Sequence, residues 1–190
     1  TEKNCGVINM KIHTLGPAVT DSYRAAEQYR ADHENLEVVG HPSFEVLYQS
    51  IPELRGELLL IPAAVKTPTG ASWGDLHYQY GDRLELIDSL ITELSPLAIL
   101  ERRGRSGQRA YCHPATIDYL TRNVAGPLEI MPCPSKWQAY RCYQTDGRYT
   151  LTSQAFAGPA DRVIKTIHLK MLWSVYQVKG ETDAKTSVNN

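Results

Sequence analysis

The sequence predicts an α/β protein with two lobes. Short apolar runs alternate with segments of helical periodicity twice along the chain, and extended segments separate the two series. The 190 residues are enough for two small lobes with hydrophobic cores. Small polar residues follow the predicted strands, at the position where open α/β sheets bind their ligands. We therefore expect two β-α-β-α-β halves with a ligand cleft between them.

The first half contains three predicted strands with a predicted helix after each of the first two. Both helices begin at good capping residues, which are Thr20-Asp21-Ser22 for the first helix and Ser43 for the second. The third run, ELLLIPA, has the continuous apolar character of a strand buried on both faces. The strands are expected at 8–15, 36–40 and 57–63, and the helices at 21–31 and 43–51.

A long loop rich in Gly, Pro, Ser and Thr is expected at residues 66–82. It contains Gly70-Ala71-Ser72-Trp73-Gly74, which matches the G-x-S-x-G motif of α/β-hydrolases. That chemistry needs the serine on a tight turn directly between a strand and a helix. Here KTPT intervenes after the strand, and GDLHYQYGD is a poor helix former. We interpret Ser72 as part of a flexible loop and not as a nucleophile.

The second half repeats the alternation after two extended segments within 83–104. Pro114 suits the first position of a helix, and Ser135 suits a cap. Strands are expected at 109–112, 128–131, 149–153, 162–166 and 173–178, and helices at 114–123 and 134–143. We expect the last strands to return to the first lobe. The first lobe then comprises 8–85 and 162–180, the second lobe 86–161, and a polar tail 181–190.

Composition excludes several classes of protein. Apolar residues make up 42% and charged residues 22%, which is globular and not disordered. The net charge is −1, and basic residues do not cluster on a helix face, so we expect no nucleic-acid or anionic-membrane partner. The longest apolar run, LLLIPAAV, is too short to span a bilayer. The N-terminal residues contain no apolar stretch of the kind found in signal peptides, which favours a cytoplasmic protein.

Cysteine and histidine spacing favours neither a metal site nor a disulfide framework. The four cysteines form no C-x-x-C pair and have no histidine at zinc-ligand spacing, and the six histidines form no H-x-x-x-H pair. We interpret the cysteines as buried or incidental thiols in a reducing compartment, and we expect no metal and no cofactor.

Several motifs resemble the prephenate dehydratase domain. Residues 14–26 read T-L-G-P-x-x-T-x-S-x-x-A-A, close to the family's opening L-G-P-x-G-T-x-S-x-x-A-A, with Val19 in place of the usual glycine. Leu60-Ile61-Pro62 resembles the start of V-P-I-E-N-S, and Cys112-His113-Pro114-Ala115 resembles S-H-P-Q-A. Ser135 with Gln138-Ala139 resembles the later S-T-x-x-A-A turn. The resemblance covers most of residues 10–180.

The departures from the family pattern are informative. Dehydratases end with N-x-T-R-F-x-V-x-G, whose Thr and Arg serve the elimination, and residues 172–180 carry Ser174 and Val175 at these two positions. The E-N-S of the strand-end motif is also missing, and with ten residues after Gly180 we expect no ACT regulatory domain of the kind common in the family. This short form, with its K-T…W-S-x-x-x-K-G ending, is most similar to the prephenate decarboxylases of the bacilysin and aeruginosin type. Those enzymes serve antibiotic and related natural-product biosynthesis.

The resemblance implies a fold of the two-lobed periplasmic-binding-protein type II kind. It implies decarboxylation of prephenate without aromatisation, to a dihydro-4-hydroxyphenylpyruvate, without a cofactor and in a homodimer. Prephenate dehydratase activity and a non-catalytic small-anion binder are the alternatives. Each candidate residue also has a structural interpretation as a cap, a turn residue or a core residue. The resemblance implies catalytic roles for His113 and Ser174, and substrate-binding roles for Thr20, Ser22, Cys112, Ser135, Lys136, Thr152 and Ser153.

Overall fold

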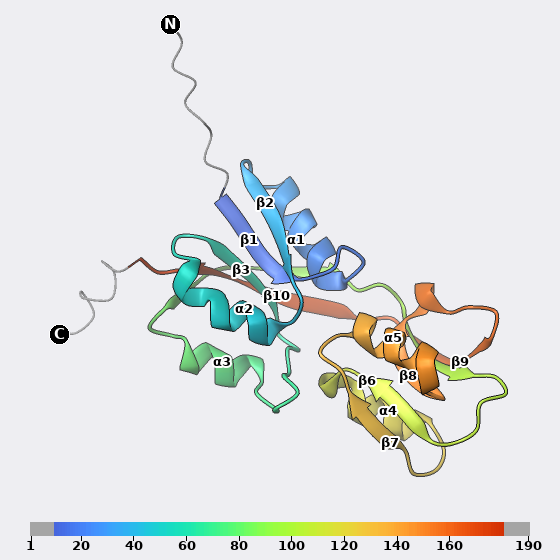
Figure 1. Cartoon of the computed structure of the whole chain (residues 1–190). Coiled ribbons are helices and arrows are strands. Elements are labelled where there is room, and N and C mark those ends of the chain that lie inside the picture. The colour runs from blue at the N-terminus through green and yellow to red at the C-terminus, as the bar shows by residue number, and fades with distance from the viewer. Residues whose placement is uncertain (1–9, 181–190) are drawn as a thin grey trace, which may run out of the picture. The chain divides into compact units, whose positions relative to one another are not determined.

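The computed structural model describes residues 10–180, which form two compact units (Figure 1). Within the described residues, unit 1 contains 10–62, 77–90 and 173–180, and unit 2 contains 63–76 and 91–172. Each unit is built on its own five-stranded mixed sheet with helices packed against it. In residues 10–180, no helix combines the length and the apolar character needed to cross a membrane.

The sheet of unit 1 has the strand order β2-β1-β3-β10-β4. β1 runs parallel to both β2 and β3, whereas β10 runs antiparallel to β3. The buried run Leu58–Pro62 forms β3, where all five side chains are buried, as its continuous apolar sequence predicts. The strands are β1 (Met10–Leu15), β2 (Leu36–His41), β3 (Leu58–Pro62), β4 (Leu84–Glu93) and β10 (Lys170–Val178).

Helices cover both faces of the unit 1 sheet. The ring of Tyr23, on α1, lies against Gly40 of β2, so a Cβ at Gly40 would meet the ring at 3.3 Å. Tyr48, on α2, lies close enough to Tyr176 of β10 for the two hydroxyls to interact electrostatically. Because residues 40 and 176 lie on opposite faces of the sheet, α1 and α2 lie on opposite faces as well. The helices are α1 (Asp21–Ala31) and α2 (Phe44–Ser50), with a 3₁₀ turn at Ile51–Glu53, and α3 (Trp73–Gln79), of which residues 73–76 group with unit 2 and residues 77–79 with unit 1.

The sheet of unit 2 has the order β7-β6-β8-β5-β9, which is equivalent to that of unit 1. β6 runs parallel to β7 and β8, and β5 runs antiparallel to β8 and β9. One face packs a cluster around Ile99, Leu120 and Leu151, and the other packs Tyr143 against Leu100. The strands are β5 (Leu97–Arg102), β6 (Arg109–Cys112), β7 (Glu129–Pro132), β8 (Tyr149–Ser153) and β9 (Asp161–Ile167), and the helices are α4 (Ile117–Asn123) and α5 (Lys136–Asp146), with 3₁₀ turns at Pro114–Thr116 and Gln154–Phe156.

The α/β class and the two β-α-β-α-β halves are confirmed, and three details differ from the prediction. A helix, α3, forms inside the segment expected to be a loop, because Ser72 and Asp75 exchange hydrogen bonds across its first turn. The segment 162–172, expected in the first lobe, groups with unit 2 because β9 pairs with β5. The helix expected at 114–123 starts as a 3₁₀ turn. Residues 8–9 and the tail 181–190 lie outside the described residues.

Candidate functional site

Polar residues gather at the carboxyl ends of the parallel strands in unit 2, and we call this group the unit 2 edge. Its members are His113 after β6, Ser135 and Lys136 after β7, and Thr152 and Ser153 at the end of β8. Because β6 lies between β7 and β8 and runs parallel to both, these strand ends meet at one edge of the sheet.

His113 is a neutral hydrogen-bond donor at this edge. Its Nδ1 accepts the Ala115 backbone N–H at 3.2 Å, so the ring proton sits on Nε2. Burial, followed by the positive charges of Lys136 and Lys66, lowers the pKa of His113 to about 4. A neutral imidazole is a weak acid, so His113 is better suited to binding an anion than to protonating a substrate. An anion bound beside it would offset the two lysine charges and raise this pKa.

The hydroxyls of the unit 2 edge support helix α5. Ser135 accepts the Gln138 backbone N–H at 3.0 Å and caps the helix, as its position in the sequence predicts. Thr152 is fully buried and donates to the Lys136 carbonyl at 2.9 Å, which ties the start of the helix to β8. Ser153 is 9% exposed. The hydrogen bonds of Ser135 and Thr152 therefore fix the backbone at the start of α5, where the half-buried Lys136 lies.

Cys112 lies in the hydrophobic core of unit 2 and not on the edge. Its exposure is 0%, and it packs with Leu120 and Leu151. Burial raises the pKa of the Cys112 thiol to about 11, so the thiolate does not form near neutral pH. In this structure Cys112 is a packing residue that positions the following His113, and it is not accessible to a ligand.

The unit 1 edge is the corresponding group at the carboxyl ends of β1–β3, and it includes Thr20, Ser22 and Ser174. The Thr20 hydroxyl accepts the Tyr23 backbone N–H at 3.2 Å and donates to the Leu15 carbonyl at 2.8 Å. Thr20 thus caps α1 and fixes the turn that leads into it. Ser22, in the first turn of the helix, is 5% exposed.

Ser174 and Val175 lie on β10 and face opposite sides of the sheet. Ser174 pairs with Ile61 near the end of β3 and is 5% exposed. Val175 pairs with Leu60 and is fully buried. The structure therefore keeps a hydroxyl at the unit 1 edge, whereas the side chain of residue 175 belongs to the core.

A chain of titratable side chains in unit 1 was not predicted from the sequence. His13 of β1 contacts Glu57, which precedes β3, and its other ring nitrogen lies 2.9 Å from the ring of His41 at the end of β2. His13 and His41 are 28 residues apart and His13 and Glu57 44 residues apart, so no local motif connects them. The sequence feature that could have indicated this contact is a histidine within the predicted strand 8–15 and another directly after the predicted strand 36–40.

The G-x-S-x-G segment does not form a catalytic serine site, and the described residues contain no cluster of metal ligands. The Ser72 hydroxyl donates to the Asp75 carboxylate at 2.6 Å, so the side chain in the G-x-S-x-G segment binds a helix residue and not a histidine. Within residues 10–180, no three His, Cys, Asp or Glu side chains converge as metal ligands would.

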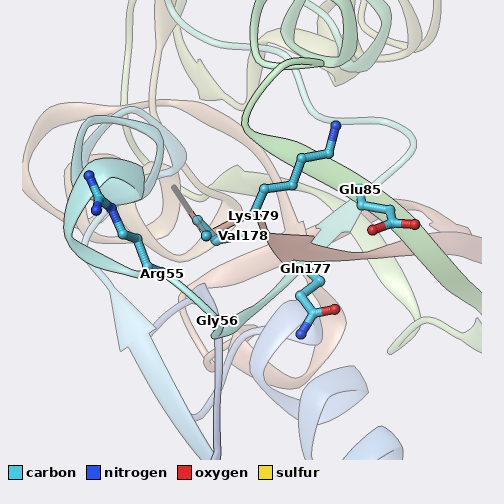
Figure 2. Close-up of a pocket in the computed structure, with 7 residues that line it drawn as sticks. Arg55, Gly56, Glu85, Gln177, Val178 and Lys179 are labelled. Carbon is cyan, nitrogen blue, oxygen red and sulfur yellow. The ribbon is translucent and has the colours of Figure 1, made fainter. Parts of the chain in front are cut away.

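A cavity of about 350 Å³ lies at the opposite end of the unit 1 sheet, where β3 begins and β10 ends (Figure 2). Figure 2 shows that Arg55, Glu85, Gln177 and Lys179 point in different directions around it. The Lys179 ammonium donates to the Gly81 carbonyl at 3.0 Å. Because these polar groups do not converge, we regard the unit 1 edge and the unit 2 edge, each considered by itself, as better candidates for ligand binding than this cavity. The cavity is lined by Arg55, Gly56, Glu85, Gln177, Val178, Lys179 and Gly180.

Comparison with solved structures relates the fold to enzymes and to binding proteins. The prephenate dehydratase of Arthrobacter aurescens, solved with L-Phe, aligns with a TM-score of 0.53 at 13% identity, over 90% of this chain and 61% of that one. The prephenate dehydratase of Staphylococcus aureus aligns with a TM-score of 0.53 at 13% identity, over 90% of this chain and 67% of that one. The holo form of ArgBP from T. maritima aligns with a TM-score of 0.52 at 8% identity, over 92% and 84%.

These similarities concern the fold, since sequence identity is low. The chain spans less than two thirds of the length of the Arthrobacter dehydratase. No protein-family profile and no curated protein sequence matches the chain. The chain has the α/β fold shared by prephenate dehydratases and type II periplasmic binding proteins.

Proposed function

We propose that the protein decarboxylates prephenate without aromatising the ring. The observation that carries the proposal is the unit 2 edge, where neutral His113 lies in the field of Lys136 and Lys66. Prephenate carries two carboxylates, and a carboxylate at this edge gains two cations and one imidazole donor. The motifs at residues 14–26 and 112–115, which resemble those of prephenate dehydratases, and the similarity of the fold to two such enzymes support the same substrate class.

The chemistry needs no electron acceptor beyond the substrate. When the ring carboxylate leaves as CO2, the electron pair of the broken C–C bond enters the cyclohexadiene, and another ring carbon takes up a proton. Dehydration would instead expel the 4-hydroxyl as CO2 leaves, and an acid or a cation would have to assist that departure. The protein must therefore supply a proton to carbon and none to the hydroxyl.

The ending of β10 supports the choice of decarboxylation over dehydration. The Arg of the dehydratase pattern corresponds to Val175, a fully buried core residue, so the cation that assists elimination in the family pattern has no equivalent at this position. Ser174 retains a hydroxyl on the other face of β10. Val175→Arg would bury a charged guanidinium in an apolar environment and destabilise the fold. Ser174→Thr restores part of the family pattern without this cost.

Two alternatives remain distinct in their products. The names of two similar structures suggest prephenate dehydratase activity as the first alternative. Such an enzyme would release phenylpyruvate. A small-anion binding protein would leave prephenate unchanged, and the similarity to ArgBP favours this as the second candidate.

The deciding experiment is proton NMR of prephenate incubated with the purified protein and, separately, without protein. The proposal expects new ring vinyl and methylene signals in the absence of aromatic protons. Aromatic protons above the control would establish dehydration and overturn the interpretation of Ser174 and Val175. Unchanged substrate would overturn an enzymatic function on prephenate, and a binding titration with the same ligand would then test the binder.

A further inference from the structure

Glu57, His13 and His41 form a continuous hydrogen-bonded chain within unit 1. The Glu57 carboxylate contacts Nε2 of His13, and Nδ1 of His13 lies 2.9 Å from Nε2 of His41. The His13 side chain is 5% exposed, whereas that of Glu57 is 29% exposed. His13 therefore connects a carboxylate to a second imidazole through a buried ring. Within residues 10–180, the side-chain hydrogen bonds of His41 involve Nε2 alone.

The outer member of the chain lies at the unit 1 edge. His41 is the last residue of β2, pairs with Leu15, the last residue of β1, and is half-buried. Its carbonyl accepts the Gly16 backbone N–H at 2.8 Å, and the Thr20 hydroxyl binds the Leu15 carbonyl next to it. His41 thus adjoins the turn that leads into α1.

Strand pairing places His41 and Ser174 on the same face of the sheet. His13, Leu59 and Tyr176 pair across β1, β3 and β10 and share a face. His41 lies two residues after Val39, the partner of His13, and Ser174 lies two residues from Tyr176 in the sequence. Because side chains alternate along a strand, both residues point to that face.

The chain can deliver a proton from Nδ1 of His41, although before delivery its positive charge is held on His13 beside Glu57. In the protonated state, His13 donates to Glu57 through Nε2 and to His41 through Nδ1, and His41 carries its own proton on Nδ1. When Nδ1 of His41 releases that proton, Nε2 of His41 takes the proton from His13. The state that remains has two neutral imidazoles beside an ionised carboxylate. A carboxylate that orients an imidazole in this way is a recurrent device of acid–base catalysis.

We propose that His41 is the proton donor of the decarboxylation and that His13 and Glu57 are positioning residues that recharge it. The inference rests on the proposed function. The bond from the ring to its carboxylate breaks, CO2 leaves, the electron pair moves through the diene to a ring carbon, and that carbon forms a bond to the proton from Nδ1 of His41. Solvent water then returns one proton to the chain.

The other candidates are poorer donors. Burial lowers the pKa of His113 to about 4, so near neutral pH its ring is neutral, and the Ala115 backbone N–H that Nδ1 accepts cannot replace a proton lost from Nε2. A serine hydroxyl such as that of Ser174 is a very weak acid. Burial, followed by the charge of His13, also lowers the pKa of His41, but the proton that His41 gives is replaced from His13 within the chain.

The test measures prephenate turnover for His41→Gln, His41→Ala and Glu57→Gln, with His168→Gln as the control because His168 is exposed on unit 2. We expect His41→Gln to lower kcat by at least about 100-fold with little change in KM. Free imidazole should restore part of the activity of His41→Ala. Glu57→Gln should lower kcat by about tenfold or more, again with unchanged KM, because the recharging step loses its carboxylate.

Each outcome decides the proposal. Wild-type protein that converts prephenate while His41→Gln retains its kcat would overturn the role of His41 and leave the proposed function intact. Wild-type protein that leaves prephenate unchanged would overturn the proposed function and the role of His41 together. Circular dichroism spectra and melting temperatures matching wild type exclude misfolding, and loss of kcat in folded His41→Ala without any imidazole rescue would contradict proton donation by this ring.

Discussion

Unit 1 and unit 2 arrange their five strands in equivalent orders, yet they carry histidines at the carboxyl ends of strands that are not equivalent. In unit 1 the end of β2 and the turn that follows read His41-Pro42-Ser43, and in unit 2 the equivalent turn after β7 reads Cys133-Pro134-Ser135. The unit 2 histidine instead follows β6, as His113. The environments differ as well, because His113 lies in the field of two lysines whereas His41 is connected through His13 to a carboxylate.

The difference separates two tasks that one scaffold can perform. A neutral imidazole among cations is suited to holding an anion, and an imidazole connected to a carboxylate is suited to moving a proton. The shared strand order supplies strand ends at an edge in both units, and a few side chains decide what each edge does. The predictions that follow test whether the units are equivalent in stability and different in chemistry.

The largest effect is expected from matched cavities in the two cores. Leu59 of β3 and Leu151 of β8 occupy equivalent strands and are 0% and 1% exposed. Leu59→Ala and Leu151→Ala should each lower the free energy of unfolding by about 2–5 kcal/mol. Denaturant unfolding measures the loss, and amide hydrogen exchange assigns it to a unit. Equal loss of protection in both units for either variant would contradict their description as separate units.

Acid should destabilise unit 2 through His113. The folded pKa, about 4, lies below the ordinary histidine value of 6.5, so the unfolded chain binds the proton more readily between these values. The free energy of unfolding should therefore fall as the pH falls from 6.5 to 4. Because part of the ring is exposed, we expect a contribution of about 2 kcal/mol. His113→Gln should flatten this part of the pH profile, and a profile parallel to wild type would refute the prediction.

The tyrosine–aspartate hydrogen bonds should differ in strength between the units. Tyr143 is fully buried and donates to Asp161 at 2.7 Å, whereas Tyr29 donates to the exposed Asp88 at 3.1 Å. Tyr143→Phe should cost about 2 kcal/mol, because it removes a hydrogen bond from a buried carboxylate. Tyr29→Phe should cost less than about 1 kcal/mol. Thermal and denaturant unfolding of both variants measures the difference, and a larger cost for Tyr29→Phe would reverse the ranking.

Removal of a lysine charge tests the proposed binding of an anion at the unit 2 edge. Lys136→Gln should weaken prephenate binding about tenfold, which corresponds to about 1.4 kcal/mol. The same variant should raise the pKa of His113, because Lys136 lowers it in the wild type. Calorimetry measures the binding, and NMR titration of the imidazole measures the pKa. Lys170→Gln is the control, since that lysine forms an exposed pair with Glu93; unchanged affinity in Lys136→Gln would argue against anion binding here.

The smallest effect is expected at the two equivalent serine caps. Ser43 accepts the Val46 N–H at 3.2 Å, and Ser135 accepts the Gln138 N–H at 3.0 Å. Ser43→Ala and Ser135→Ala should each cost about 1 kcal/mol of stability. If Ser135 also contacts the substrate, only Ser135→Ala should raise KM. Equal KM values for the two variants would restrict Ser135 to capping.

Local patterns in the sequence predict much of the fold and only part of the site. The helix starts at Thr20, Ser43 and Ser135 follow from capping residues, and the buried strand at 58–62 follows from its apolar run. Helix α3 was missed because Gly74 and the polar residues around it have low helix propensity, and Ser72 and Asp75 compensate for this.

Long-range pairing explains the remaining differences. Residues 162–172 are expected in the first lobe because strand propensity does not reveal the partner strand, whereas they group with unit 2 through the pairing of β9 with β5. The motif at 112–115 suggests a binding role for Cys112, whereas its side chain is buried in the core of unit 2. The contacts of His13 with His41 and Glu57 depend on neighbouring strands that are far apart in the sequence.

The place of β10 in its sheet has a consequence for protein synthesis. β10 lies between β3 and β4, so unit 1 needs residues 173–178 before its sheet is continuous. The sheet of unit 2 is complete once residue 167 has been made. On the ribosome, residues 10–62 therefore wait for β10, the last strand of the described residues, whereas unit 2, most of which is translated after them, can already pack. Unit 2 should resist proteases earlier than unit 1 in a series of stalled nascent chains.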